Sequence, residues 1–182
     1  MRSHPPPKVL ASIESPTAEW SSWSNPIFRS ICVGWLIFLS LNRANAATYT
    51  VNNATDFNNL PRLNAGDVVQ MNSGTYGAIN KTLESSISDD TTAKNNPVLV
   101  YAVTPGGVVV NAPSKITLSG RGIILAGLDF NANSGILSDY LVGTASGSRY
   151  MTLSHLRFNG CAVGATDGKW IYIQGFYATI EY

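Results

Sequence analysis

The segment Arg121–Phe130 reads Arg-Gly-Ile-Ile-Leu-Ala-Gly-Leu-Asp-Phe, and its apolar pattern returns in Arg149–Phe158, which reads Arg-Tyr-Met-Thr-Leu-Ser-His-Leu-Arg-Phe. Each apolar anchor of the first copy has its counterpart 28 residues later (151 − 123 = 28). The anchors of the first copy are Ile123, Leu125, Leu128 and Phe130, and those of the second are Met151, Leu153, Leu156 and Phe158. A third, weaker copy is expected at a shorter offset, 171 − 151 = 20, with anchors at Ile171, Ile173, Phe176 and Ala178. A unit of two short strands and a corner cannot bury its own apolar face, so such units must stack.

Stacked units of this kind predict an all-β fold, a right-handed parallel β-helix (a solenoid) of about four to five coils. The apolar anchors of both copies are expected to face the interior. A short helix over Ala54–Leu63, with Asn53 and Thr55 as N-cap candidates and Pro61 limiting its length, is expected to cap the open N-terminal coil. The chain stops at Ile180-Glu181-Tyr182, within an expected strand, so the solenoid is expected to be incomplete at the C-terminus.

A secretory signal is expected in front of this domain. Ile31–Leu39 is an apolar run preceded by Arg29 and followed by Ala44-Asn45-Ala46, a small-x-small cleavage pattern. The run is shorter than the ~20 residues that span a bilayer; a core strand or a non-cleaved anchor is the alternative. We therefore expect a leader and signal peptide at 1–46, a β-helix domain at 47–182, secretion to the extracellular space or the periplasm, and no transmembrane span.

Further strands are expected where β-branched residues alternate or run together, at Thr48–Val51, Val68–Met71, Val98–Val103, Val108–Val110 and Ile116–Leu118. Polar or Gly- and Asn-bearing segments between them are expected to be loops, at Gly77–Pro97, Asn131–Asp139 and Asn159–Gly168.

Charge and cysteine content restrict the class of protein. Charged residues make up 13% of the 182 residues, with a net charge of +1, but from Ala47 onward 4 Lys and 4 Arg face 7 Asp and 2 Glu, so that 8 − 9 = −1. No basic field attracts nucleic acid or an acidic polymer at long range, and an acidic substrate needs a local site. Cys32 falls in the leader, so Cys161 is expected to be a lone, small, buried residue of the coil interior.

Several phrases of the mature region resemble one family of secreted enzymes. Ala65–Gln70, followed by Gly74-Thr75-Tyr76, looks like the opening coil of pectin-lyase-like β-helices. Later phrases resemble successive coils of polysaccharide lyase family 6, which contains alginate lyases and chondroitinase B, and these phrases are Asn96–Ala102, Pro105–Val108, Gly127–Phe130, Lys169–Gly175 and Ala178–Tyr182. The resemblance covers about Ala47 to Tyr182.

The resemblance implies a reaction and a place for its active site. Similar enzymes cleave a 4-linked uronic acid chain by β-elimination, in which calcium neutralises the uronate carboxylate, a lysine acts as base and an arginine stands near the leaving oxygen. In the family these groups lie on coils C-terminal to the segment that Trp170-Ile171 resembles, and no position of Ala47–Tyr182 matches their motifs. The resemblance therefore implies no catalytic and no metal-binding residue in this chain, whose catalytic groups are expected beyond Tyr182. It implies calcium for the full-length member only, and a chain that is inactive alone.

Four cations are candidates for binding an acidic polysaccharide. Arg121 and Arg149 occupy equivalent repeat positions and are expected to stack, either as a surface ladder with salt bridges or as a cationic strip that faces a uronate chain. Arg157 and Lys169 are candidates for the same strip. The aromatic residues Tyr172, Phe176 and Tyr177 either stack on sugar rings or pack within the coils.

The remaining polar candidates have plainer interpretations. Asp89-Asp90 is the densest acidic pair and is expected in a solvated loop. His155, next to Ser154 at a strand corner, is expected to be a hydrogen-bonded structural residue rather than a base.

Three functional classes follow. The first is a secreted polysaccharide lyase, monomeric and without a nucleic-acid partner, that acts on an acidic uronate-containing polysaccharide of the alginate or chondroitin/dermatan type. The second is a non-catalytic β-helix, carbohydrate-binding or adhesin-like. The third, a glycoside hydrolase, needs a close pair of carboxylates, whereas Asp129 and Asp139 fall in different sub-segments.

Overall fold

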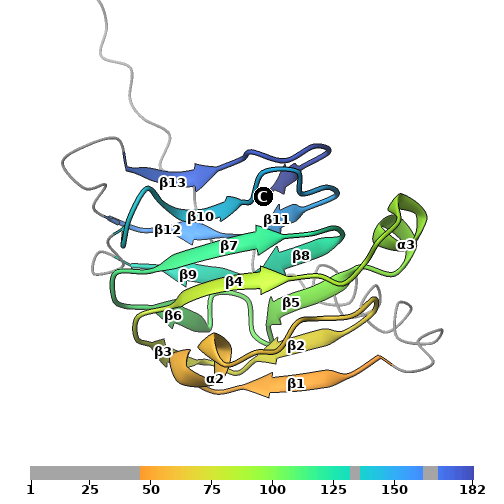
Figure 1. The fold of residues 1–182 in the computed structure, drawn as a ribbon. Coiled ribbons are helices and arrows are strands. Elements are labelled where there is room, and N and C mark those ends of the chain that lie inside the picture. Colours follow the sequence, from red (N-terminus) through yellow and green to blue (C-terminus); the bar gives the residue numbers. More distant parts are fainter. Residues whose placement is uncertain (1–45, 132–135, 162–167) are drawn as a thin grey trace, which may run out of the picture. The chain divides into compact units, whose positions relative to one another are not determined.

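The computed structural model describes residues 46–131, 136–161 and 168–182, and their strands form three parallel sheets that the chain enters in turn (Figure 1). The six-stranded sheet contains β1 (Thr48–Val51), β2 (Val68–Met71), β5 (Val98–Ala102), β8 (Ile123–Ala126), β11 (Thr152–Ser154) and β14 (Thr179–Glu181). The β3 sheet contains β3 (Gly74–Tyr76), β6 (Val108–Val110), β9 (Leu128–Phe130) and β12 (Arg157–Phe158). The β4 sheet contains β4 (Asn80–Glu84), β7 (Lys115–Ser119), β10 (Tyr140–Thr144) and β13 (Lys169–Tyr172).

The described residues are therefore all-β and solenoid-like, as the repeat predicts. The offset between the first two copies is confirmed by the strand register, in which Leu125 pairs with Leu153 and Phe130 pairs with Phe158. From β2 to β13 each coil carries three strands, one in each sheet, so the two strands recognised in the sequence are the first two of three.

The third copy of the repeat is wrong in its placement. Ile171 lies on β13 and pairs with Val142 of the β4 sheet, whereas the residue that pairs with Leu153 is Ile180. The true offset from the second copy is thus 180 − 153 = 27 in residue number, close to that between the first two copies. Because a coil has three strands, an alternating apolar run in its third strand imitates the first strand of the next coil.

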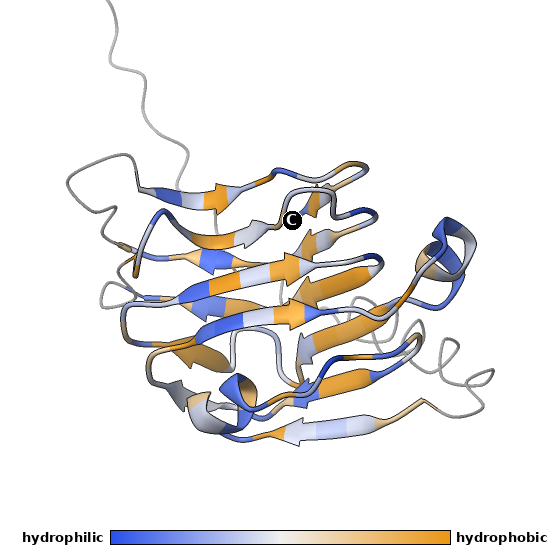
Figure 2. Cartoon of the chain, viewed as in Figure 1, coloured by the Kyte–Doolittle hydropathy of each residue, from blue (hydrophilic) through white to orange (hydrophobic). Residues whose placement is uncertain are grey.

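The core is a set of apolar rows that run across the coils. In the six-stranded sheet Val69, Val100, Leu125 and Leu153 stack in register and are at most 1% exposed. Figure 2 shows hydrophobic stretches along β2, β5 and β8, with hydrophilic residues in the segment around α3. Burying a side chain of this size stabilises the fold by about 1.5–3 kcal/mol.

The expected N-terminal helix is present but shorter than expected. Asn53 caps α2 (Ala54–Asn58) by accepting a hydrogen bond from the Asp56 amide at 2.9 Å. Pro61, which has no amide hydrogen, follows shortly after the helix ends. The segment covers the edge of β4, since the Asn80 amide donates to Asn58 Oδ1 at 3.0 Å and Leu63 bridges to Ser85.

The expectation of a single loop over Gly77–Pro97 is wrong, because this segment contains β4 and a second helix, α3 (Asp90–Asn95). The strand has a polar outer face, and of its residues only Leu83 is a buried apolar side chain. A stretch with one apolar anchor lacks the alternation by which a strand is recognised. The short helix begins at a capping aspartate, a residue type that is equally common in solvated loops.

The other expected strands are confirmed to within a residue at their ends. The described parts of the expected loops at 131–139 and 159–168 contain no strand beyond an isolated bridge at Ile136. The expected leader lies outside the described residues, apart from Ala46. Within the described residues no helix has the length and apolar character needed to cross a membrane.

Candidate functional site

The predicted arginine ladder is present at the corner that leads into the six-stranded sheet. Arg121 and Arg149 form a parallel backbone bridge shortly before β8 and β11. Their guanidinium groups share one carboxylate, with Arg121 Nη1 2.9 Å from Asp90 Oδ1 and Arg149 Nη1 3.4 Å from Asp90 Oδ2. The arginine side chains stay 31% and 39% exposed, so the ladder reaches the surface.

Helix α3 brings this carboxylate to the ladder. Asp89 caps the helix by accepting the Thr92 amide at 2.8 Å. That hydrogen bond is the main cause that holds the pKa of Asp89 below its ordinary value, and the nearby charge of Arg121 acts in the same direction. The expected solvated loop is therefore wrong for the secondary structure, since Asp89 caps a helix and Asp90 begins it. Asp89 is exposed to solvent as expected, whereas Asp90 is engaged with the arginines.

The corner carries more positive than negative charge. Lys94, in the last turn of α3, places its ammonium 4.9 Å from the centre of the Tyr150 ring, so it lies close to the ladder. Three cations thus gather around two carboxylates, and we call this group the α3 corner: Asp89, Asp90, Lys94, Arg121 and Arg149. It is a local site of the kind that an acidic ligand requires in a chain without a basic field.

Two tyrosines stand beside the ladder on an uncommon backbone. Tyr150 and Tyr177 have φ angles of 55° and 54°, in the left-handed region that few residues other than glycine adopt. Their rings stack with centroids 5.0 Å apart and an interplanar angle of 7°. The register puts Gly122 at the same position one coil earlier, where a Cβ atom would lie 2.8 Å from Ala93 of α3. Glycine at this position allows α3 to pack beside the tyrosine pair.

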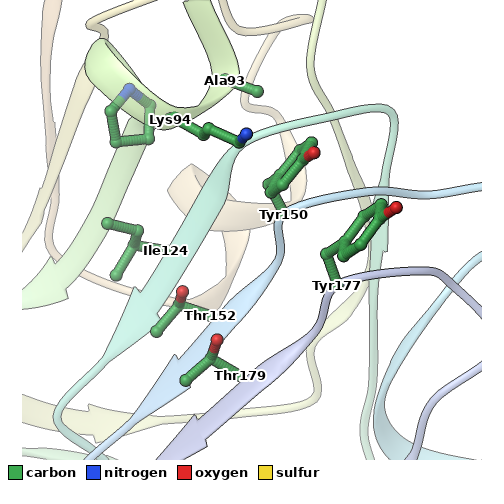
Figure 3. Close-up of a pocket in the computed structure, with 8 residues that line it drawn as sticks. Ala93, Lys94, Ile124, Tyr150, Thr152, Tyr177 and Thr179 are labelled. Carbon is green, nitrogen blue, oxygen red and sulfur yellow. The ribbon is translucent and has the colours of Figure 1, made fainter. Parts of the chain in front are cut away.

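An open groove of about 200 Å³ lies between α3 and the outer face of the six-stranded sheet. Figure 3 shows Lys94 and the two tyrosine rings on one side, and a row of side chains from β8, β11 and β14 on the other. The groove is lined by Ala93, Lys94, Pro97, Ile124, Tyr150, Thr152, Tyr177 and Thr179.

Arg157, expected on the same strip, lies elsewhere. It is on β12 of the β3 sheet and donates a hydrogen bond to Asp129 of β9, its partner in the strand register. Asp129 is 4% exposed, and its Oδ1 atom has no hydrogen-bond partner among the described residues. The hydrogen bond from Arg157 to this carboxylate raises the pKa of the guanidinium further.

Lys169 is also separated from the ladder. It begins β13 in the β4 sheet, and its ammonium lies 5.2 Å from the centre of the Tyr172 ring. A three-strand coil points its outer residues in three directions, so cations on different strands of the coil do not share one strip. Arg121 and Arg149 lie side by side. Arg157 and Lys169 lie away from this pair, on strands of two different sheets.

The aromatic candidates divide in the same way. Tyr177 joins the groove, and Phe176 lies beneath the guanidinium of Arg149, whose Cζ atom is 5.7 Å from the ring centre. Tyr172 belongs to the β4 sheet, where its ring lies 5.6 Å from that of Tyr140.

His155 and Cys161 have the structural roles that the sequence predicts. His155 Nδ1 lies 2.6 Å from Ser154 Oγ at a corner with φ = 51°. Cys161 is 4% exposed, its thiol donates to the Phe130 carbonyl at 3.1 Å, and burial raises its pKa.

The described residues form no site for the calcium ion that the resemblance implies for the full-length member. Calcium takes six to eight oxygen ligands, but no three His, Cys, Asp or Glu side chains gather as a metal site in the part of the chain that the structure describes. The oxygens of Asp90 face arginines, and Asp129 faces Arg157.

Sequence reasoning missed Lys94, Tyr150, Thr152 and Thr179 as groove residues. The true repeat is the signal for the tyrosines and threonines, because each pair has its offset in residue number, 177 − 150 = 27 and 179 − 152 = 27. Lys94 lies on α3, outside the repeat, and has no such signal. The incorrect, shorter offset of the third copy concealed both pairs.

Comparison with known proteins gives one family. The sequence model of the family described as Chondroitinase B matches residues 51–167, well over half of the chain. No curated protein gives a significant match to the sequence.

Proposed function

Since the chain belongs to the chondroitinase B family, we propose that it forms part of a secreted polysaccharide lyase that cleaves a uronate-containing polysaccharide of the chondroitin/dermatan or alginate type by β-elimination. The family match over residues 51–167 is the observation that carries the proposal. We also propose that the coils form a right-handed parallel β-helix and that the protein is a monomer.

The α3 corner supports the choice of an acidic polymer. Arg121 and Arg149 lie one coil apart in the sequence and are adjacent in space, so they form a row across the coils. Guanidinium groups bind carboxylates and sulfates through paired hydrogen bonds. In the proposal, acidic groups of the polysaccharide compete with Asp90 for this ladder, while the catalytic groups lie on coils C-terminal to Tyr182, as the resemblance implies.

β-Elimination needs three things together: a base for the C5 proton, neutralisation of the adjacent carboxylate and an acid for the leaving oxygen. Such groups act as a unit, and loss of one forfeits most of the rate. We therefore expect the 182-residue chain to bind the polymer without cleaving it.

Two measurements on the purified chain test the proposal. Calorimetric titration with chondroitin sulfate and with alginate should show binding that weakens as salt is added, because the contacts are ionic. Ultraviolet absorbance of the unsaturated uronate product, recorded with calcium present, should not rise. Absence of binding to both polymers would contradict the proposal, and a rising absorbance would place the catalytic groups within this chain.

A non-catalytic carbohydrate-binding or adhesin-like β-helix would give the same binding result. Transcript sequence beyond Tyr182 separates the two functions. The lyase predicts further coils with lysine, arginine and acidic calcium ligands, and the adhesin predicts none of these.

A further inference from the structure

We propose that the groove between α3 and the six-stranded sheet is a subsite for one anionic sugar unit, a uronate, with its ring stacked on Tyr177. This inference rests on the proposed function, because it names the unit that a bound acidic polysaccharide would place there. The arginine ladder offers the polysaccharide ionic contacts, whereas the groove offers one of its sugar units a surface of complementary shape.

Tyr177 offers a fixed and accessible ring. One face of the ring stacks on Tyr150, yet the side chain remains 67% exposed. Stacking on Tyr150 favours one orientation of the ring. An aromatic ring held in this way packs well against the C–H face of a sugar, at a low cost in conformational entropy.

The floor of the groove carries hydroxyl groups. Thr152 and Thr179 pair in register on β11 and β14, and Ile124 continues the row on β8. In Figure 3 both threonine hydroxyls lie on the side that faces the tyrosines. A hydroxyl both donates and accepts hydrogen bonds, which suits the hydroxyls around a sugar ring. The volume of about 200 Å³ is below the ~300–1,000 Å³ of sites for drug-sized ligands, which favours a single sugar unit.

The charges at the rim select an anion. Lys94 lines the groove, and Arg149 lies next to Tyr150 in sequence. The acidic residues of the α3 corner already accept hydrogen bonds. Asp89 accepts from the Thr92 amide of the helix, and Asp90 accepts from the two arginines and, at 3.4 Å, from the hydroxyl of Tyr150. The eight lining residues include one cation and no carboxylate, so a sugar carboxylate or sulfate meets attraction at this rim.

The test measures binding of chondroitin, alginate and neutral glucan hexasaccharides to the full chain by calorimetric titration. Tyr177→Gly removes the ring and suits the left-handed backbone, since Gly122 holds the equivalent position in an earlier coil. We expect Tyr177→Gly to weaken uronate binding about tenfold. Lys94→Gln should weaken binding of the uronate hexasaccharides without changing binding of the neutral glucan. Tyr182→Ala, which removes an 82% exposed ring outside the groove, should bind like the wild type.

The outcomes separate this inference from the proposed function. If the wild type binds neither uronate hexasaccharide, the proposed function fails. If it binds them and Tyr177→Gly binds equally well, the groove is not the subsite and the inference is overturned. Equal affinity for the neutral glucan would overturn the choice of an anionic sugar. Thermal melts of each variant confirm that a loss of binding is not a loss of fold.

Discussion

Two sites in this chain pair arginine with aspartate, and the pairing has a different effect in each. At the α3 corner Arg121 and Arg149 share the carboxylate of Asp90, whose side chain is 35% exposed. In the β3 sheet Arg157 alone pairs with Asp129, whose side chain is 6% exposed. The first site keeps a surplus of positive charge at the surface, and the second neutralises a buried negative charge.

This difference shows that the partner, rather than the arginine, decides what a surface cation does. A buried carboxylate must keep its counterion, because an uncompensated charge in the interior costs several kcal/mol. A carboxylate that is shared and one-third exposed holds each arginine weakly and can yield it to an external anion. Arg157 is therefore tied to the fold, whereas Arg121 and Arg149 are available to a ligand.

The largest expected effect comes from breaking the buried pair. Arg157→Ala should destabilise the fold by about 2–3 kcal/mol, less than the ~3–5 kcal/mol of a fully buried pair because Arg157 is itself 60% exposed. Urea unfolding followed by circular dichroism measures the change. The double variant Arg157→Ala/Asp129→Asn removes both charges and should recover most of the loss. A single variant as stable as the wild type would remove the distinction between the two sites.

The next largest effect tests how α3 packs against Gly122. Gly122→Ala should cost about 1–2 kcal/mol for the left-handed backbone, with φ = 64°, and more because its Cβ would meet Ala93. Gly147→Ala is the matched control, since it has φ = 77° and nothing within 4 Å of the added Cβ. The difference between the two melting temperatures isolates the contact with α3. Equal losses would mean that α3 does not depend on the glycine.

A smaller effect is expected from freeing the ladder. Asp90→Asn removes the carboxylate that competes with the polysaccharide, and it should tighten uronate binding about two- to fivefold, equivalent to ~0.5–1 kcal/mol. Titrations at low and high salt measure the gain, which should shrink at high salt. Asp139→Asn, at an exposed carboxylate beside Lys115, is the control and should change little. Weaker binding by Asp90→Asn would show that Asp90 organises the ladder instead of competing for it.

The smallest effect concerns stability at the α3 corner. Arg149→Ala should change the free energy of unfolding by less than about 1 kcal/mol, because its ion pair is exposed and Asp90 keeps Arg121. Urea unfolding beside Arg157→Ala makes the comparison direct. A loss as large as that of Arg157→Ala would assign the ladder to the fold.

Much of the fold was predictable because stacked coils repeat their apolar anchors. Leu125 and Leu153 fix the register of two coils, and their constant offset is visible without a structure. What escaped prediction was that every such coil has a third strand. Ile116–Leu118 was recognised as a strand, but β4 has one buried apolar residue and β13 imitates a first strand.

The candidate site was predictable only in part. The equivalence of Arg121 and Arg149 follows from the repeat, but their partner Asp90 lies far earlier in the chain, in a helix whose sequence resembles a loop. The separation of Arg157 from the ladder depends on which of three sheets each strand joins. The repeat offset does place Arg157 opposite Asp129, since 157 − 129 = 28. The burial of Asp129, which ties Arg157 to the fold, follows only from the packing of the coils.

The most direct test of the contrast is one binding measurement on two double variants. Arg121→Ala/Arg149→Ala removes the ladder, and Arg157→Ala/Asp129→Asn removes the buried pair without leaving an unpaired charge. Titration with a uronate hexasaccharide should show about a tenfold or greater loss for the first variant and an affinity close to that of the wild type for the second. Equal affinities for both variants, or a larger loss for the second, would contradict the assignment of the α3 corner as the polysaccharide-binding site.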